Sequence, residues 1–127
     1  MLLSEYQTHL AEIINRFART DLIVTIELTL DARTPKIGMI KGSLAFVDGT
    51  QLYFSEYVDV RYRIEKLSYV YHVQDTESKV VFRYDNAAHK PALPYACHKH
   101  TATGKVKEAD PPDLEDILNE IIERFIP

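Results

Sequence analysis

Apolar residues follow a helical period at both ends of the chain. From about Ser4 to Arg19 they recur every three or four positions, which predicts an amphipathic helix. A second stripe with this spacing follows two prolines near the C-terminus and comprises Leu114, Ile117, Leu118, Ile121, Ile122 and Phe125. The pattern therefore predicts one helix at the start of the chain and one at its end.

Between these helices the apolar residues alternate with polar ones, the period of a half-buried strand. Five alternating or β-branched runs cover residues 22–30, 36–47, 51–60, 62–75 and 80–84, and residues 95–101 could form a sixth. The dipeptide Asp48-Gly49 is a strong hairpin signal, and the short connections exclude parallel crossovers. We predict an α+β domain over residues 1–127: an antiparallel meander of five or six strands, with both helices on one face and the other face open.

Composition narrows the class of protein. The chain has 127 residues, 46% hydrophobic and 27% charged, as expected of one globular domain. No apolar run approaches the roughly 20 residues that span a bilayer, and the start MLLSEYQTHL is not a secretory signal. The one cysteine, Cys97, excludes an internal disulfide and suits a reducing compartment. We expect a cytoplasmic protein without a membrane segment.

Charge is segregated along the C-terminal half. From Lys79 to Lys107 there are six Lys or Arg residues and one acid, whereas Glu108–Pro127 holds seven acids and one base. A locally basic surface can attract an anionic substrate even though the formal net charge is -4. The acidic tail could equally be the solvated face of the last helix.

Titratable side chains are concentrated between Val80 and His100. In the run VVFRYD, Phe82 is the expected core residue, so Arg83 and Asp85 share the opposite face. His98 and His100 are also two residues apart and share a face. If the two strands pair, these four side chains converge, and His89 in the connecting turn could join them.

This set has the residue types needed for RNA cleavage without a metal. Two histidines can serve as the base for the 2′-hydroxyl and the acid for the leaving oxygen. Arg83 or Lys99 can stabilise the charge that builds on the phosphate, and Lys90 adds positive charge nearby. We predict no metal and no cofactor.

Three other interpretations remain open at this stage. His98, His100 and either His89 or Asp85 could bind zinc, although neighbouring lysines would repel a dication. The histidines could have a purely structural role in a protein that binds a partner through its sheet or last helix. Strand tyrosines could also stack on the bases of single-stranded RNA.

Several motifs resemble the TumE-like family of small prokaryotic toxins. They are PheSerGluTyrVal at 54–58, LysLeuSerTyrValTyrHis at 66–72, PheArgTyrAspAsnAla at 82–87 followed by His89, and HisLysHis at 98–100. The resemblance implies a toxin that acts on RNA, neutralised by a cognate antitoxin that is a small helix-turn-helix DNA-binding protein. Carried over by position, it adds Glu56, Tyr71, Tyr84 and Asn86 to the candidate site.

The chain departs from the family pattern at two positions, because Lys90 and Cys97 stand where histidines are frequent. This departure weakens a metal site in particular. We therefore predict catalytic roles for His98, His100, Arg83, His89 and Asp85. The predicted substrate-binding residues are Lys99, Lys90, Tyr84, Tyr71, Asn86 and Glu56. Exposed strand edges also predict a homodimer.

Overall fold

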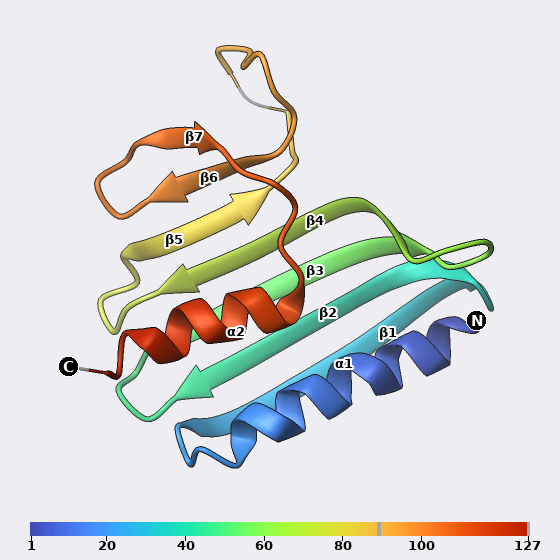
Figure 1. Cartoon of the computed structure of the whole chain (residues 1–127), viewed down its shortest axis with the longest axis horizontal. Helices are drawn as coiled ribbons and strands as arrows, with labels where there is room; N and C mark the ends of the chain where they lie inside the picture. The colour runs from blue at the N-terminus through green and yellow to red at the C-terminus, as the bar shows by residue number, and fades with distance from the viewer. Residues whose placement is uncertain (89, 127) are drawn as a thin grey trace.

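The fold is an antiparallel sheet with both helices on one face (Figure 1). It was obtained as a computed structural model that describes residues 1–88 and 90–126. The elements in chain order are α1 (Leu3–Ala18), β1 (Ile23–Thr34), β2 (Ile37–Phe46), β3 (Gln51–Asp59), β4 (Glu65–Gln74), β5 (Val80–Asp85), β6 (His98–Thr101), β7 (Val106–Glu108) and α2 (Leu114–Glu123).

The sheet is a seven-stranded meander in which each strand pairs with the next along the chain. The predicted class and topology are confirmed, but the predicted number of strands, five or six, is wrong. The strand that was missed is β7, which pairs antiparallel with β6. It is three residues long, Val-Lys-Glu, so it is too short to show the alternation that reveals a strand in a sequence.

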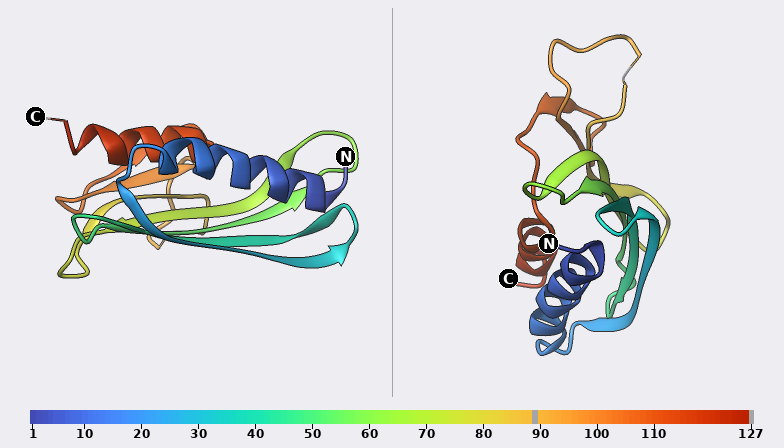
Figure 2. Two further views of the ribbon diagram at one scale, coloured as in Figure 1. Left: turned by 90° about the horizontal axis from the view of Figure 1, so that it is seen from below. Right: turned by 90° about the vertical axis from the view of Figure 1, so that its right-hand side faces the viewer.

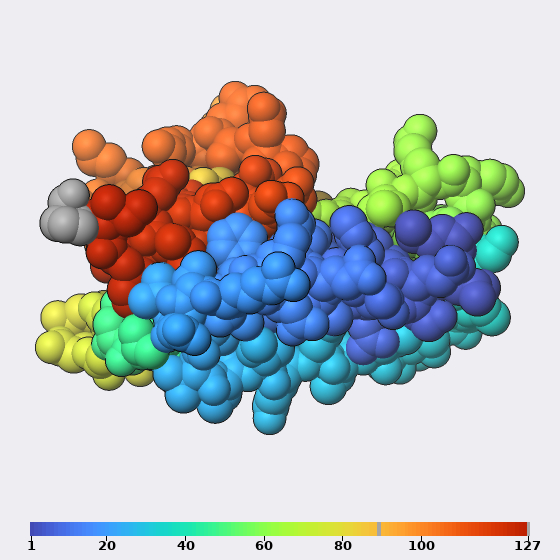
Figure 3. Space-filling model, turned by 60° about the horizontal axis from the view of Figure 1, so that its bottom comes forward, coloured from blue at the N-terminus to red at the C-terminus, as the bar shows by residue number. Residues whose placement is uncertain are grey.

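Both helices pack on the same face of the sheet, and no helix of the described residues lies on the opposite face (Figure 2). They lie side by side across the covered face, α1 in blue and α2 in red (Figure 3). The predicted stripes supply the buried residues of each helix, including Leu10 and Ile14 of α1 and Ile117 and Ile121 of α2. Between helices and sheet these residues form one core with Leu44, Leu52, Tyr71 and Phe82.

A fully buried carboxylate lies within this core. Glu56 of β3 accepts hydrogen bonds from the hydroxyls of Tyr6 on α1 and Tyr71 on β4. Lys66 Nζ lies 3.5 Å from Glu56 Oε2 and donates to Tyr71 Oη over 2.6 Å. A buried charge is tolerated when it is paired and hydrogen-bonded in this way. The cluster thus joins the first helix to the middle of the sheet.

In the part of the chain that the structure describes, neither helix has the length and apolar character needed to cross a membrane.

Candidate functional site

The open face of the sheet carries two parallel rows of side chains that run across the strands. Residues paired directly across neighbouring antiparallel strands point to the same face. Register therefore aligns Tyr53, His72, Arg83 and His100 in one row, on β3 to β6. It aligns Ser55, Val70, Asp85 and His98 in the row beside it. The two rows bring residues from four strands into one surface.

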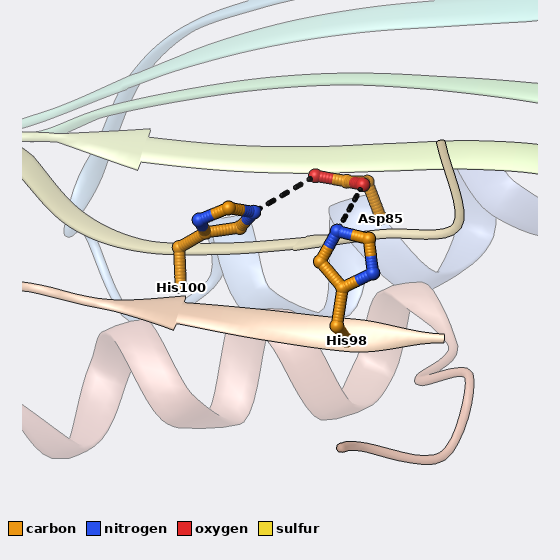
Figure 4. Close-up of side chains that lie close together, drawn as sticks. All are labelled: Asp85, His98 and His100. Carbon is orange, nitrogen blue, oxygen red and sulfur yellow. Dashed lines mark ion pairs between the residues drawn. The ribbon is translucent and has the colours of Figure 1, made fainter. Parts of the chain in front are cut away.

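Asp85 is the centre of this surface (Figure 4). Its carboxylate is 2% exposed. Oδ1 lies 2.8 Å from His98 Nε2 and accepts the Ala87 N–H over 3.0 Å. Oδ2 accepts from Arg83 Nε over 2.9 Å and lies 3.7 Å from His100 Nε2. The predicted convergence of Arg83, Asp85, His98 and His100 is confirmed.

His98 is enclosed by the protein. Its ring is 2% exposed, and Nδ1 lies 3.0 Å from the carbonyl oxygen of Ala96. Because a carbonyl only accepts, Nδ1 carries a proton, while Nε2 faces Asp85. Both ring nitrogens are thus engaged inside the protein. His98 can orient Asp85 but does not reach a substrate in this arrangement.

Arg83 and His100 are the accessible members of the centre. Their side chains are 38% and 29% exposed, respectively, and both lie against Asp85 Oδ2. The carboxylate holds the guanidinium through a charge-assisted hydrogen bond. A positive charge and an imidazole therefore lie together on the open face.

His72 completes the accessible surface; it ends the motif at 66–72 but was not among the predicted site residues. It lies across β4 and β5 from Arg83, with Nδ1 3.5 Å from Arg83 Nη1. Its Nε2 is 3.1 Å from Gln74 Oε1. Because an amide oxygen only accepts, Nε2 carries the proton and Nδ1 presents its lone pair toward Arg83. In the sequence, the alternation of His72 with the core residue Tyr71 was the signal that could have placed it on the open face.

Several residues predicted to bind substrate lie elsewhere. Lys99 and Tyr84 are on the helix-covered face, where both bond to Glu120 of α2. The buried cluster described above contains Tyr71 and Glu56. Asn86 bridges to β4: its Oδ1 accepts the Tyr69 N–H, and its Nδ2 donates to Leu67 O. Lys99, Tyr84, Tyr71 and Glu56 therefore lie on the helix-covered side of the sheet, and the Asn86 side chain is bonded to β4.

Two further predicted residues lie in or near the segment between β5 and β6. Lys90 is exposed there. His89 lies outside the described residues.

Asp85, His98 and His100 also form a set of donors that could hold a metal ion. One ligand atom from each lies within 4.8 Å of the others. The backbone carbonyl on His98 Nδ1 is a typical outer partner of a metal-binding histidine. The Arg83 cation on Asp85 Oδ2 opposes a dication at the same carboxylate. The donor set therefore has the composition of a metal site, but its charge is better matched to an anion.

These features define the class of protein as an α+β domain with an arginine–histidine–aspartate centre on a helix-free sheet face. A family model described as "Toxin TumE" matches residues 10–126, nearly the whole chain. The chain belongs to this family, as the motifs had indicated. It is thus a toxin of the toxin–antitoxin type, and family membership implies an antitoxin partner. Comparison with curated proteins and with solved structures gave no match.

Proposed function

We propose that this toxin cleaves RNA at the Asp85 centre by metal-independent acid–base chemistry. The observation that carries the proposal is the pair of half-exposed imidazoles, His72 and His100, on either side of Arg83. They lie two strands apart, so their backbones are separated by about 10 Å. Such a separation leaves space for a phosphodiester between a base and an acid, with the guanidinium against its oxygens.

The contacts of the two imidazoles assign the roles of base and acid. His72 Nδ1, which faces Arg83 with a lone pair, takes the proton from the 2′-hydroxyl as the O2′–P bond forms. His100, next to the Asp85 carboxylate, gives its proton to O5′ as the P–O5′ bond breaks. Arg83 stabilises the charge on the phosphate oxygens. The products are a 2′,3′-cyclic phosphate and a 5′-hydroxyl, and exchange with water restores both imidazoles.

His98 and Asp85 have a positioning role in this proposal. The sequence had suggested His98 as an acid or base, but its buried ring and its two partners favour a supporting role. The buried His98–Asp85 pair holds the carboxylate in place, and the carboxylate in turn orients Arg83 and His100.

A direct test incubates the purified protein with single-stranded RNA in excess EDTA. We expect cleavage that leaves cyclic phosphate ends. His100→Ala should lower the rate by about 100- to 10,000-fold, as for loss of an acid–base group, and Arg83→Ala by about 100-fold or more. His9→Ala is the matched control, because His9 is exposed on α1, away from the open face.

The alternative outcomes are informative. Cleavage that EDTA abolishes and zinc or manganese restores would favour a metal-dependent hydrolase, the second candidate supported by the Asp85–His98–His100 donor set. No cleavage in any condition would favour a toxin that acts by binding a partner. We further propose that the antitoxin is a small helix-turn-helix DNA-binding protein; purification of the toxin with the product of the neighbouring reading frame would test this.

A further inference from the structure

We propose that the hollow beside Arg83 on the open face is a subsite for one nucleoside of single-stranded RNA. It would hold the nucleoside whose 2′-hydroxyl attacks the phosphate, with the base stacked on Tyr53 and Lys41 next to the sugar–phosphate chain. This inference rests on the proposed function, because the scissile phosphate is placed at Arg83. The subsite adds two binding residues that the sequence motifs did not include, Lys41 of β2 and Tyr53 of β3.

The hollow has the size and lining of a small-ligand site. Its volume is about 380 Å³, and it lies among β2, β3, β4 and β5. Small-molecule sites commonly measure roughly 300–1,000 Å³. Tyr53 and His72 supply aromatic rings, and Ser55 and Val70 lie in the row behind them. A flat base can therefore contact an aromatic ring and an apolar surface at once.

The charges of the side chains that line the hollow favour the binding of an anionic chain. Lys41 and Arg83 both line the hollow, and none of its described lining residues is a carboxylate. A neighbouring hollow of about 270 Å³ shares Lys41 and Tyr53 but is also lined by Glu27. A phosphate is repelled by that carboxylate. The subsite is therefore limited to one nucleotide, between Arg83 and Lys41.

Hydrogen bonds hold the two rings of the subsite in place before any ligand binds. Tyr53 Oη donates to Gln51 Oε1 over 2.6 Å, and Gln74 Nε2 donates to the same oxygen over 3.4 Å. Gln74 Oε1 in turn accepts from His72. Side chains that are already ordered lose less entropy on binding. Tyr53 is nevertheless 42% exposed, so its ring remains available to a base.

The position of His72 connects the subsite to the chemistry. His72 lines the hollow and presents Nδ1 toward Arg83. A nucleoside stacked on Tyr53 thus has its ribose next to the proposed base, and its 3′-phosphate at the guanidinium. The leaving nucleotide then lies on the His100 side. This order across the strands follows from the register alone.

Binding can be measured separately from cleavage. The probe is a short fluorescent single-stranded RNA with every 2′-hydroxyl methylated, which cannot be attacked by its own 2′-oxygen, titrated in EDTA. Tyr53→Ala should weaken binding by about 5- to 100-fold, the loss of one base stack. Tyr53→Phe should bind within about threefold of the wild type because the ring is retained. Tyr62→Ala is the matched control, because Tyr62 is 93% exposed and does not line the hollow.

Lys41 is tested through the salt dependence of the same binding. Lys41→Ala should reduce the slope of log affinity against log salt by about one phosphate contact. Lys36→Ala, at an exposed turn between β1 and β2, should leave the slope unchanged. Melting temperatures of all variants are compared with the wild type, since these side chains lie on the surface and their loss should leave the fold intact.

The outcomes distinguish the subsite from the proposed function. If the wild type cleaves ordinary RNA in EDTA but Tyr53→Ala binds as tightly as Tyr62→Ala, the subsite is wrong and the proposed function stands. If the wild type binds the methylated RNA through Tyr53 and Lys41 but never cleaves ordinary RNA, the subsite stands and the proposed chemistry is wrong. If the wild type neither binds the probe at low salt nor cleaves ordinary RNA in EDTA, both are wrong.

Discussion

At the scale of single residues, the contacts of the Asp85 carboxylate orient the neighbouring side chains. Its two carboxylate oxygens accept N–H groups from Ala87 and Arg83, His98 Nε2 lies 2.8 Å from Oδ1, and His100 lies on the same side as Arg83. A buried carboxylate is stable only with such partners. The same contacts leave the Arg83 guanidinium and the His100 ring oriented on the open face. Stability and proposed function therefore depend on one side chain.

Asp85→Asn should separate these two contributions. The amide can still accept the Ala87 N–H, but it no longer balances the charge of Arg83. We expect RNA cleavage to fall by about 100-fold or more while the fold remains. Asp85→Ala should in addition lower the free energy of unfolding by about 3–5 kcal/mol, as when one partner of a buried ion pair is removed.

Urea unfolding and cleavage assays on the same samples check this prediction. Asp31→Asn serves as the control, because Asp31 is an exposed acid of β1. Full cleavage by folded Asp85→Asn would show that the carboxylate does not orient the site.

At the scale of elements, the Glu56 cluster joins α1 to β3 and β4. Tyr6 and Tyr71 donate to the two oxygens of one carboxylate, and Lys66 bonds to Tyr71 and to the carbonyl of Pro112 just before α2. Burial first, and then the charge of Glu56, raises the pKa of both tyrosines above the ordinary value. Glu56 and Tyr71, which were predicted to bind substrate, form in this fold a junction between helices and sheet.

This junction predicts a loss of stability at alkaline pH. Tyrosines that stay protonated in the folded protein ionise in the unfolded chain near pH 10. Their contribution to stability is thus complete below about pH 10 and is lost as the pH rises above it. Tyr6→Phe should reduce this alkaline slope and lower the free energy of unfolding by about 1–3 kcal/mol, because Glu56 loses a donor.

The measurement is the urea midpoint between about pH 8 and pH 11, a range that spans the unfolded tyrosine pKa. Tyr62→Phe is the control, since Tyr62 is exposed and lies outside the cluster. An alkaline slope that is the same in Tyr6→Phe and in the wild type would contradict the role given to the junction.

At the scale of the whole molecule, the sheet separates the helix-packed face from the face that we propose binds RNA. The helices and core occupy one face, and the proposed RNA surface occupies the other (Figure 2). The two faces are nevertheless coupled through β5 and β6. Glu120 of α2 accepts from Tyr84 Oη over 2.6 Å and from Lys99 Nζ over 2.8 Å. These contacts hold the strands that carry Arg83, Asp85, His98 and His100.

Glu120→Ala should therefore loosen the site from the far side of the sheet. We expect faster hydrogen exchange of the β6 amides, by about 10- to 100-fold, because a contact to a charged group contributes about 1.5–3 kcal/mol. RNA cleavage should decrease, although Glu120 does not lie on the open face. Hydrogen-exchange mass spectrometry and the cleavage assay check both effects.

Glu115→Ala is the control on the same helix, because Glu115 pairs with Arg16 of α1 at the surface. Unchanged exchange in β6 after loss of Glu120 would show that α2 does not support the site. The homodimer expected from exposed strand edges stays a prediction, and size-exclusion chromatography with light scattering tests it.

Most of the fold followed from local patterns in the sequence. The helical stripe and the two-residue alternation are properties of neighbouring residues, so they predicted both helices, the antiparallel meander and the shared faces of Arg83 with Asp85 and of His98 with His100. β7 was missed because three residues are too few to show a period. Family motifs identified the toxin, but they could not separate residues of the site from residues of the core.

The tertiary structure decided which of these residues can act. Strand register places His72 beside Arg83 and Tyr53 beside His72, and register depends on how neighbouring strands align, which alternation within one strand does not reveal. His98 and His100 share a face, yet the first is buried and the second half-exposed, because burial depends on what packs around each ring. Alternation alone determined the face of each side chain; only packing determined its partners, its exposure and its charge.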